Sequence, residues 1–111
     1  MPDKKPYLGE FEELLLLAIL RLRDNAYGMT IRQTVADATG RETSIGAIYT
    51  TLERMEQKGF ISSRQGEATP ERGGRAKRYF EITGTGAQAL ADAQRARDLL
   101  RGQPKAAGGL A

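Results

Sequence analysis

The segment from Arg64 to Arg78 reads RQGEATPERGGRAKR and directly follows a predicted helix that ends in Lys58-Gly59. It holds five Arg and Lys residues against two Glu residues, so its formal charge is 5 − 2 = +3. The whole chain has 17 Lys and Arg against 14 Asp and Glu, which also gives +3. The excess positive charge is therefore confined to one glycine-flanked hairpin. A projecting, positively charged hairpin beside a short helix is typical of nucleic-acid binding. Charge alone fits a solvated surface loop equally well.

The composition of the chain excludes several other function classes. A chain of 111 residues supports one domain. It has no Cys and no His, so disulfides, the usual metal ligands and the commonest general base are missing. The sequence also shows no pair of carboxylates in an apolar setting and no convincing phosphate-binding glycine loop. We therefore expect a protein that is not an enzyme and that holds no cofactor or metal.

The apolar run from Leu14 to Leu20 lies in a first predicted helix, from about Leu8 to Asp24. It is too short to cross a membrane, and the Glu residues before it do not suit a secretion signal, so we expect a cytoplasmic protein. A helix that is apolar on all sides must bury one face in its own core and another against something else, most simply a second copy. We expect Phe11 and Leu15 at this dimer interface.

The third predicted helix, Ile45 to Lys58, follows a second helix from about Met29 to Ala38 that ends at Gly40. The core stripe of the second helix consists of Tyr27, Ile31, Val35 and Ala38. Ser44 is a suitable N-cap for the third helix. The core face of the third helix consists of Ile45, Ile48, Leu52 and Met55, and its opposite face of Gly46, Ala47, Thr50, Arg54 and Gln57, with Tyr49 on the flank. Small, uncharged residues in its first two turns favour a helix that enters the major groove over an ordinary surface helix.

The remaining segments complete the domain. We predict a strand from Phe60 to Gln65, a loop from Gly66 to Gly74, a returning strand from Arg75 to Ile82, and a last helix from about Thr85 to Arg101 with Thr83 as its N-cap. A heptad-like seam on that helix consists of Ala89, Ala93, Ala96 and Leu100. This seam suits either a dimer interface or packing on the same subunit. We expect a flexible arm over residues 1–7 and a disordered tail over residues 102–111.

This order of elements is that of a winged helix-turn-helix domain, and the sequence resembles the PadR family of transcriptional regulators. The resemblance covers about residues 8 to 100. It rests on Tyr27-Gly28, on the segment from Gly46 to Ile61 (GAIYTTLERMEQKGFI), and on the segment from Gly73 to Thr83 (GGRAKRYFEIT) followed by Gly86.

The resemblance implies a mainly α fold with a small two-stranded antiparallel wing, divided into a DNA-binding domain (8–83) and a dimerisation helix (84–101). It implies a bacterial regulator, in most cases a repressor, that dimerises through its first and last helices and binds a palindromic DNA operator. A single C-terminal helix resembles the compact subfamily, some members of which bind flat hydrophobic drugs at the dimer interface. This chain has no Trp, so the aromatic platform for such a ligand is missing, and a small aromatic or hydrophobic effector stays an open possibility.

These considerations predict a homodimer bound to double-stranded DNA. The expected DNA-binding residues are Ser44, Gly46, Tyr49, Thr50 and Arg54 on the third helix, and Arg72, Gly74, Arg75 and Lys77 on the wing. The expected dimer-interface residues are Phe11, Leu15, Ala89, Ala93, Ala96 and Leu100. The alternative is a winged-helix protein-interaction module that does not read DNA, although such modules usually lose the basic wing.

Overall fold

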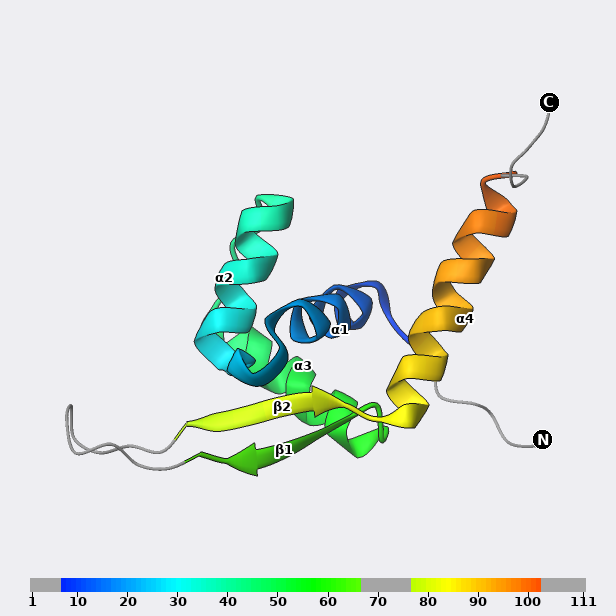
Figure 1. Cartoon of the computed structure of the whole chain (residues 1–111). Helices are drawn as coiled ribbons and strands as arrows, with labels where there is room; N and C mark the ends of the chain where they lie inside the picture. Colours follow the sequence, from blue (N-terminus) through cyan, green and yellow to red (C-terminus); the bar gives the residue numbers. More distant parts are fainter. Residues whose placement is uncertain (1–6, 67–76, 103–111) are drawn as a thin grey trace.

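The computed structural model describes residues 7–66 and 77–102 and is mainly helical, with one two-stranded antiparallel sheet. The elements are α1 (Glu10–Leu22), a single 3-10 turn η1 (Arg23–Asn25), α2 (Gly28–Thr39), α3 (Ile45–Gln57), β1 (Ile61–Gln65), β2 (Arg78–Ile82) and α4 (Gly84–Leu100). Figure 1 shows α1 in the middle, between α2 and α4, with the sheet along the lower edge. We call the β1–β2 hairpin the wing. The predicted fold class is confirmed.

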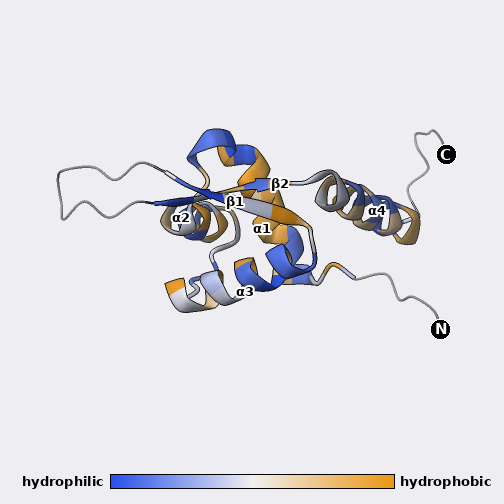
Figure 2. Ribbon diagram, turned by 90° about the horizontal axis from the view of Figure 1, so that it is seen from below, coloured by the Kyte–Doolittle hydropathy of each residue, from blue (hydrophilic) through white to orange (hydrophobic). Residues whose placement is uncertain are grey.

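The hydrophobic core lies where α1, α2, α3 and the wing meet. Its buried side chains include Leu15, Leu16, Ile19, Ile31, Val35, Ile48, Leu52, Met55, Phe60, Ile61 and Phe80. Figure 2 shows the apolar colour concentrated along α1, the central helix. Ala38 is exposed, so the prediction that it belongs to the core stripe of α2 is wrong. The reason is that Val35 is the last buried residue of α2, and the final turn of this helix extends past α1 into solvent (Figure 1).

The predicted helix caps are confirmed. The Ser44 hydroxyl accepts a hydrogen bond from the Ala47 amide of α3 at 3.1 Å, and the Thr83 hydroxyl accepts one from the Gly86 amide of α4 at 3.0 Å. Gly40 ends α2 with φ = 76°, in the left-handed region that glycine adopts without strain. The first helix is shorter than predicted: it begins at Glu10 rather than Leu8, and Arg23 and Asp24 belong to the separate 3-10 turn η1.

Strand β2 of the wing is joined to the segment just before α2. Within the wing the pairing runs from Ile61 opposite Ile82 to Gln65 opposite Arg78. Tyr27, which has extended backbone just before α2, forms an additional antiparallel bridge with Tyr79. Next to it, the Phe80 amide donates to the Ala26 carbonyl at 2.9 Å. The start of α2 and strand β2 of the wing are therefore held in a fixed relation, which the sequence pattern does not predict.

Two adjacent buried carboxylates at the start of α1 hold two other helices. Glu12 accepts hydrogen bonds from the Lys58 ammonium, at the C-terminal end of α3, at 2.9 and 3.0 Å. Glu13 accepts from the Arg97 guanidinium of α4, with a shortest distance of 2.6 Å. The acidic residues at this helix start suit the helix dipole. Their larger role is to join α1 to the end of α3 and to α4.

Helix α4 packs on the domain mainly through its first turns. Its buried residues are Gly86 and Leu90, whereas Leu99 and Leu100 are 73% and 88% exposed. Figures 1 and 2 both show α4 standing to one side of the other elements. Among the helices of residues 7–66 and 77–102, none is long and apolar enough to span a bilayer.

Candidate nucleic-acid interface

Helix α3 is fixed on one side and open on the other. Its inner face is fully buried at Ile48, Leu52 and Met55. The loop before it is fixed by Arg32, whose Nε donates to the Thr43 carbonyl at 2.8 Å. Burial of one face and anchoring of the preceding loop give α3 a defined orientation, as a helix that reads a groove requires.

The outer face of α3 is exposed along its length, as predicted. Its exposed residues are Gly46, Ala47, Thr50, Arg54 and Gln57. A Cβ atom at Gly46 would meet nothing closer than the Ser44 hydroxyl at 4.0 Å, so packing does not require glycine there. The Thr50 hydroxyl donates to the Gly46 carbonyl at 3.0 Å and keeps its capacity to accept. The first two turns of this face therefore carry only small, uncharged side chains, which would allow the backbone of α3 to come close to a binding partner.

Tyr49 occupies a different position from its neighbours on α3. Its ring is half-buried and lies against Gly28 at the start of α2, so closely that a Cβ at Gly28 would overlap the ring and its hydroxyl. Tyr49 therefore packs α3 against α2 and explains the glycine of the Tyr27-Gly28 pair. This contact argues against the predicted role of Tyr49 at the groove.

Lys77 is exposed at the loop end of the wing, just before β2, and three neighbours form a cluster with it. The Lys77 ammonium lies 4.8 Å from the centre of the Tyr27 ring, and the Arg64 guanidinium lies 4.9 Å from that of Tyr79. The two tyrosine rings meet edge to face at 5.5 Å. Stacking on these rings holds both cations in place while leaving them open to solvent. Arg64 was not among the predicted site residues, and Arg72, Gly74 and Arg75 lie outside the described residues.

Arg78 does not contribute to the positive charge of the wing as the sequence suggests. Its guanidinium donates to Glu53 at 3.1 Å and to Glu56 at 2.6 Å, both on α3, and to the Ser63 hydroxyl at 3.2 Å. Partial burial alone would lower the pKa of Arg78, but the hydrogen bonds and negative charges of Glu53 and Glu56 raise it above its usual value. Arg78 is thus neutralised locally and joins β2 to α3.

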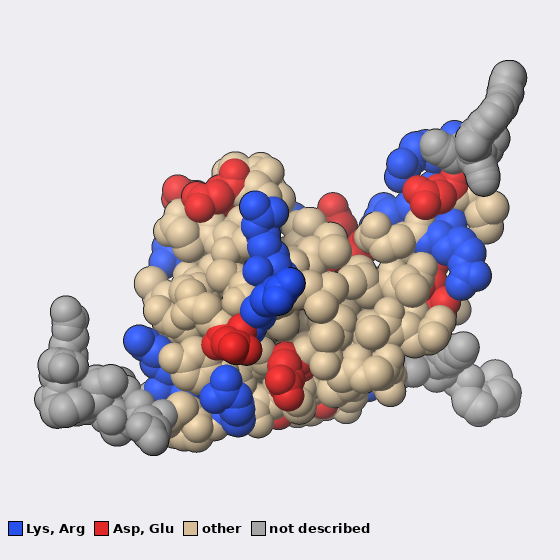
Figure 3. Space-filling view, viewed as in Figure 1, with Lys and Arg blue, Asp and Glu red and all other residues tan. Residues whose placement is uncertain are grey.

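The charges visible in Figure 3 are mixed rather than of one sign. On that face, Lys and Arg side chains lie beside the wing, along a stripe over the middle of the molecule, and on α4, with acidic side chains between them. In the part of the chain that the structure describes, no three His, Cys, Asp or Glu residues gather to hold a metal ion.

The predicted dimer residues differ in how much surface they offer. Leu15 is fully buried in the core of its own subunit, so it has no surface left for a partner. Phe11 is half-buried beneath the Arg41 guanidinium, which lies 5.3 Å from the ring centre. On α4, Ala96 and Leu100 are exposed, and Ala89 and Ala93 are half-buried. Leu17 and Leu20 of α1, which were not predicted, are 41% and 46% exposed. Which side of α1 the core occupies depends on tertiary packing, so the sequence pattern of this helix does not select Leu17 and Leu20 over Leu15.

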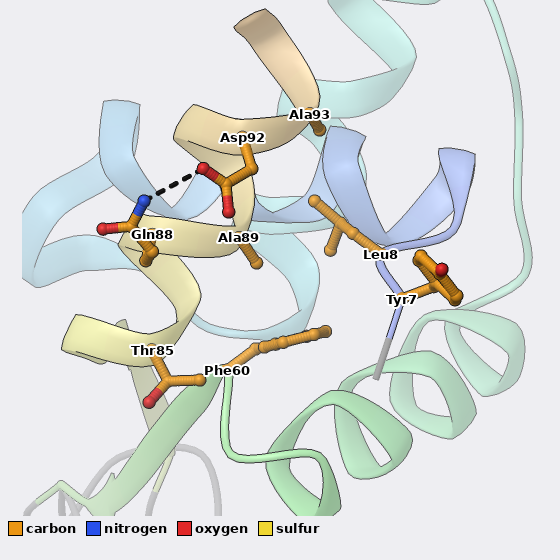
Figure 4. Close-up of a pocket in the computed structure, with 8 residues that line it drawn as sticks. All are labelled: Tyr7, Leu8, Phe60, Thr85, Gln88, Ala89, Asp92 and Ala93. Carbon is orange, nitrogen blue, oxygen red and sulfur yellow. Dashed lines mark hydrogen bonds between the residues drawn. The ribbon is translucent and has the colours of Figure 1, made fainter. Parts of the chain in front are cut away.

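A cavity of about 610 Å³ lies between the first half of α4 and the segment before α1. Its apolar lining includes Leu8, Phe60, Ala89 and Ala93, and Thr85, Gln88 and Asp92 lie on α4 at its rim. Figure 4 shows Leu8 pointing toward α4 across this space, with Tyr7 beyond it on the side away from α4 and Gln88 hydrogen-bonded to Asp92. Two residues of the predicted seam, Ala89 and Ala93, therefore line a pocket.

Comparison with known proteins agrees with this geometry. The model of the PadR-like family of transcriptional regulators matches residues 16–92. The chain belongs to the PadR-like family. This membership supports a DNA-binding regulator of transcription as the function class and offers no support for catalysis.

Solved structures of PadR-like and other regulators share the fold. A transcriptional regulator from Thermoplasma acidophilum is 25% identical with a TM-score of 0.64, and the match covers 80% of this chain and 84% of that one. A PadR family regulator from Eggerthella lenta is 24% identical with a TM-score of 0.63, covering 80% and 75%. One from Clostridium difficile is 23% identical with a TM-score of 0.63, covering 81% and 90%. No match to this chain was found among curated proteins.

Proposed function

We propose that this PadR-like protein is a repressor that binds a palindromic operator as a homodimer, with α3 in the major groove and the wing along the adjacent backbone. The observation that carries the proposal is the outer face of α3, which is exposed, small and uncharged at Gly46, Ala47 and Thr50. An ordinary solvated helix face would carry charged side chains at these positions. Here the first charged residue of the helix is Glu53.

In this arrangement the N-terminal half of α3 reads bases and the flanking residues hold phosphates. Thr50 accepts from, or makes methyl contact with, base edges in the groove. The Ser44 oxygen accepts the cap hydrogen bond, so its O–H can donate to a phosphate. Arg54 and the exposed cations Arg64 and Lys77, at the loop end of the wing strands, supply phosphate contacts that set the register of the protein on the duplex. Arg72 and Arg75 would add to this charge.

The homodimer is supported by apolar surface on two helices. Leu17 and Leu20 of α1 and Leu99 and Leu100 of α4 are all at least 41% exposed. Ala93 and Ala96 lie on the same seam of α4 as Leu100 and are small enough to allow close approach of another helix. Pairing through these helices relates two copies of α3 by a two-fold axis, so the operator half-sites lie about one helical turn apart.

A ligand response would originate at the cavity beside α4. Its volume of about 610 Å³ is within the range of small-molecule pockets, and its floor at Phe60 is apolar. Because Ala89 and Ala93 belong both to this cavity and to the proposed dimer seam, a small aromatic or hydrophobic effector there would change how α4 packs. Effector binding would then release the operator.

The proposed function is tested by titrating the protein onto the promoter next to its own gene, at physiological salt, in a gel shift. Retention of that fragment over an unrelated fragment of the same length supports a DNA-reading regulator. Equal retention of both fragments, or of neither, would favour the alternative of a protein-interaction module.

Replacement of Gly46 by leucine is expected to lower operator affinity at least about tenfold, since it introduces a bulky side chain where α3 must approach base edges and one good base contact is worth roughly 1–3 kcal/mol. The fold should tolerate the change, because the space around Gly46 is open. The matched control is Gly84→Leu, an exposed helical glycine on α4 with nothing within 4 Å of its Cβ position. Equal losses of affinity for the two variants would rule out close approach at Gly46.

Replacement of Lys77 by alanine is expected to flatten the salt dependence of binding. The slope of log affinity against log salt should fall by about 0.9 for the one phosphate contact that is lost. The affinity for specific and unrelated DNA should drop by the same factor, because phosphate contacts carry no sequence information. The control is Arg95→Ala on α4, which removes the same charge far along the chain from the wing. A Lys77 variant with the slope of the Arg95 variant would exclude this residue from phosphate binding.

A further inference from the structure

Glu13 of α1 has an unusual set of partners for a residue in the first turn of a helix. Its side chain is only 8% exposed. Arg97 donates to it from Nη2 at 2.6 Å and from Nε at 3.1 Å, and Gln94 donates from its amide at 2.7 Å. These hydrogen bonds and the negative charge of Glu13 raise the pKa of Arg97 above its usual value. A single buried carboxylate thus holds two residues, one turn apart, on α4.

This contact is the main restraint on the second half of α4 within the described residues. From Ala91 to Leu100 no residue of α4 is buried, and the other ion pairs there, Arg95 with Asp92 and Arg101 with Asp98, stay within the C-terminal segment itself. Near its start, α4 is positioned by the packing of Gly86 and Leu90. With one fixed point near each end, the direction in which α4 leaves the domain is determined by Glu13.

Glu12, the carboxylate next to Glu13, connects the same turn of α1 to the end of α3. Glu12 binds Lys58, the residue that caps the C-terminal end of α3, and its Oε1 accepts from the Gly9 amide at 2.7 Å. Glu12 and Glu13 are consecutive on a helix, so their separation is rigid. The end of the proposed groove-reading helix and the second half of the proposed dimerisation helix are therefore attached to the same turn of α1.

We propose that Glu13 is a positioning residue that, through Arg97 and Gln94, sets the angle of α4 and thereby the separation of the two α3 helices in the homodimer. The inference rests on the proposed homodimer. In such a dimer α4 connects the two winged domains, so a small change in its angle is amplified into a larger change at α3. A fixed separation is what makes a dimer prefer one spacing of operator half-sites.

The experiment uses the absence of cysteine from the natural chain. The variant Gln57→Cys carries one cysteine at an exposed position at the end of α3, and it is spin-labelled in the full-length protein. The distance between the labels of the two copies in the homodimer is then measured by pulsed electron–electron double resonance. We expect one narrow distance distribution in the parent protein. Arg97→Ala should shift or broaden it, and Glu13→Gln, which keeps the shape of the side chain but removes its charge, should do so to a smaller extent.

The matched control is Arg95→Ala, which removes the same charge from the same helix but breaks only an exposed pair with Asp92. It should leave the distribution unchanged. A merely structural role for Glu13 would lower the melting temperature without altering the distance in dimers that remain folded, and this result would overturn the inference. An equal shift with Arg95→Ala would also overturn it. Absence of any label-to-label distance in the parent would show a monomer and would remove the homodimer itself, which separates the two failures.

Discussion

Replacement of Lys58 by alanine is expected to lower the free energy of unfolding by about 3 kcal/mol, because it leaves a buried carboxylate without its cation. Glu12 is only 4% exposed at its side chain and receives both of its charged hydrogen bonds from Lys58. The Gly9 amide that remains is a weaker, neutral donor. Urea denaturation followed by circular dichroism measures the effect.

Two further variants show whether burial of the charge is the cause. Arg101→Ala removes an exposed cation whose pair with Asp98 lies on the surface, so its cost should stay below about 0.5 kcal/mol. The double variant Glu12→Gln, Lys58→Met should recover much of the loss, since it removes the unpaired charge as well as the pair. A Lys58→Ala protein as stable as the Arg101→Ala protein would mean that water reaches Glu12 and that the pair does not fix the end of α3.

The second large effect on the free energy of unfolding is expected from a substitution at Gly86, in the first turn of α4. A Cβ at this position would overlap the backbone carbonyl of Phe60. That carbonyl cannot move freely, because it accepts from both the amide and the hydroxyl of Thr83 at 3.0 Å. We expect Gly86→Ala to cost about 2 kcal/mol, since overpacking of roughly 1–3 kcal/mol exceeds the gain in helix propensity of up to about 1 kcal/mol.

Gly84 provides the matched control two residues earlier in the same helix. Nothing lies within 4 Å of its Cβ position, so Gly84→Ala should raise the stability by about 0.5 kcal/mol through helix propensity alone. The opposite signs of these two changes in stability, measured by thermal unfolding, test how closely α4 approaches Phe60. A stabilised Gly86→Ala protein would place the start of α4 further from Phe60.

The local features of this fold follow closely from the sequence. The spacing of Ile48, Leu52 and Met55 identifies the buried face of α3, and therefore also its exposed face, because one helical period determines both. The caps at Ser44 and Thr83 involve donors only three residues away. Such short-range chemistry does not depend on how distant parts of the chain meet, so a single sequence is sufficient to predict it.

The contacts that could not be predicted join residues far apart along the chain. The partners of Glu13 lie 81 and 84 positions away, and those of Arg78 on α3 lie 22 and 25 positions away. The inward position of Tyr49 depends on how α3 crosses the start of α2. The full burial of Leu15 depends on which side of α1 the core forms. A charge count or a helical wheel contains no information about these crossings. The predicted wing charge was therefore too high by the amount that Glu53 and Glu56 neutralise.

The junction of α2, α3 and the wing contains three of the four tyrosines of the chain, Tyr27, Tyr49 and Tyr79, each half-buried. Because the chain has no Trp, its intrinsic fluorescence comes from tyrosine alone, and only Tyr7 emits from an exposed site outside this junction. The unmodified protein therefore carries its own optical reporter at the place where α2, α3 and the wing meet. A change in tyrosine emission on addition of a duplex would monitor movement of that junction without any label.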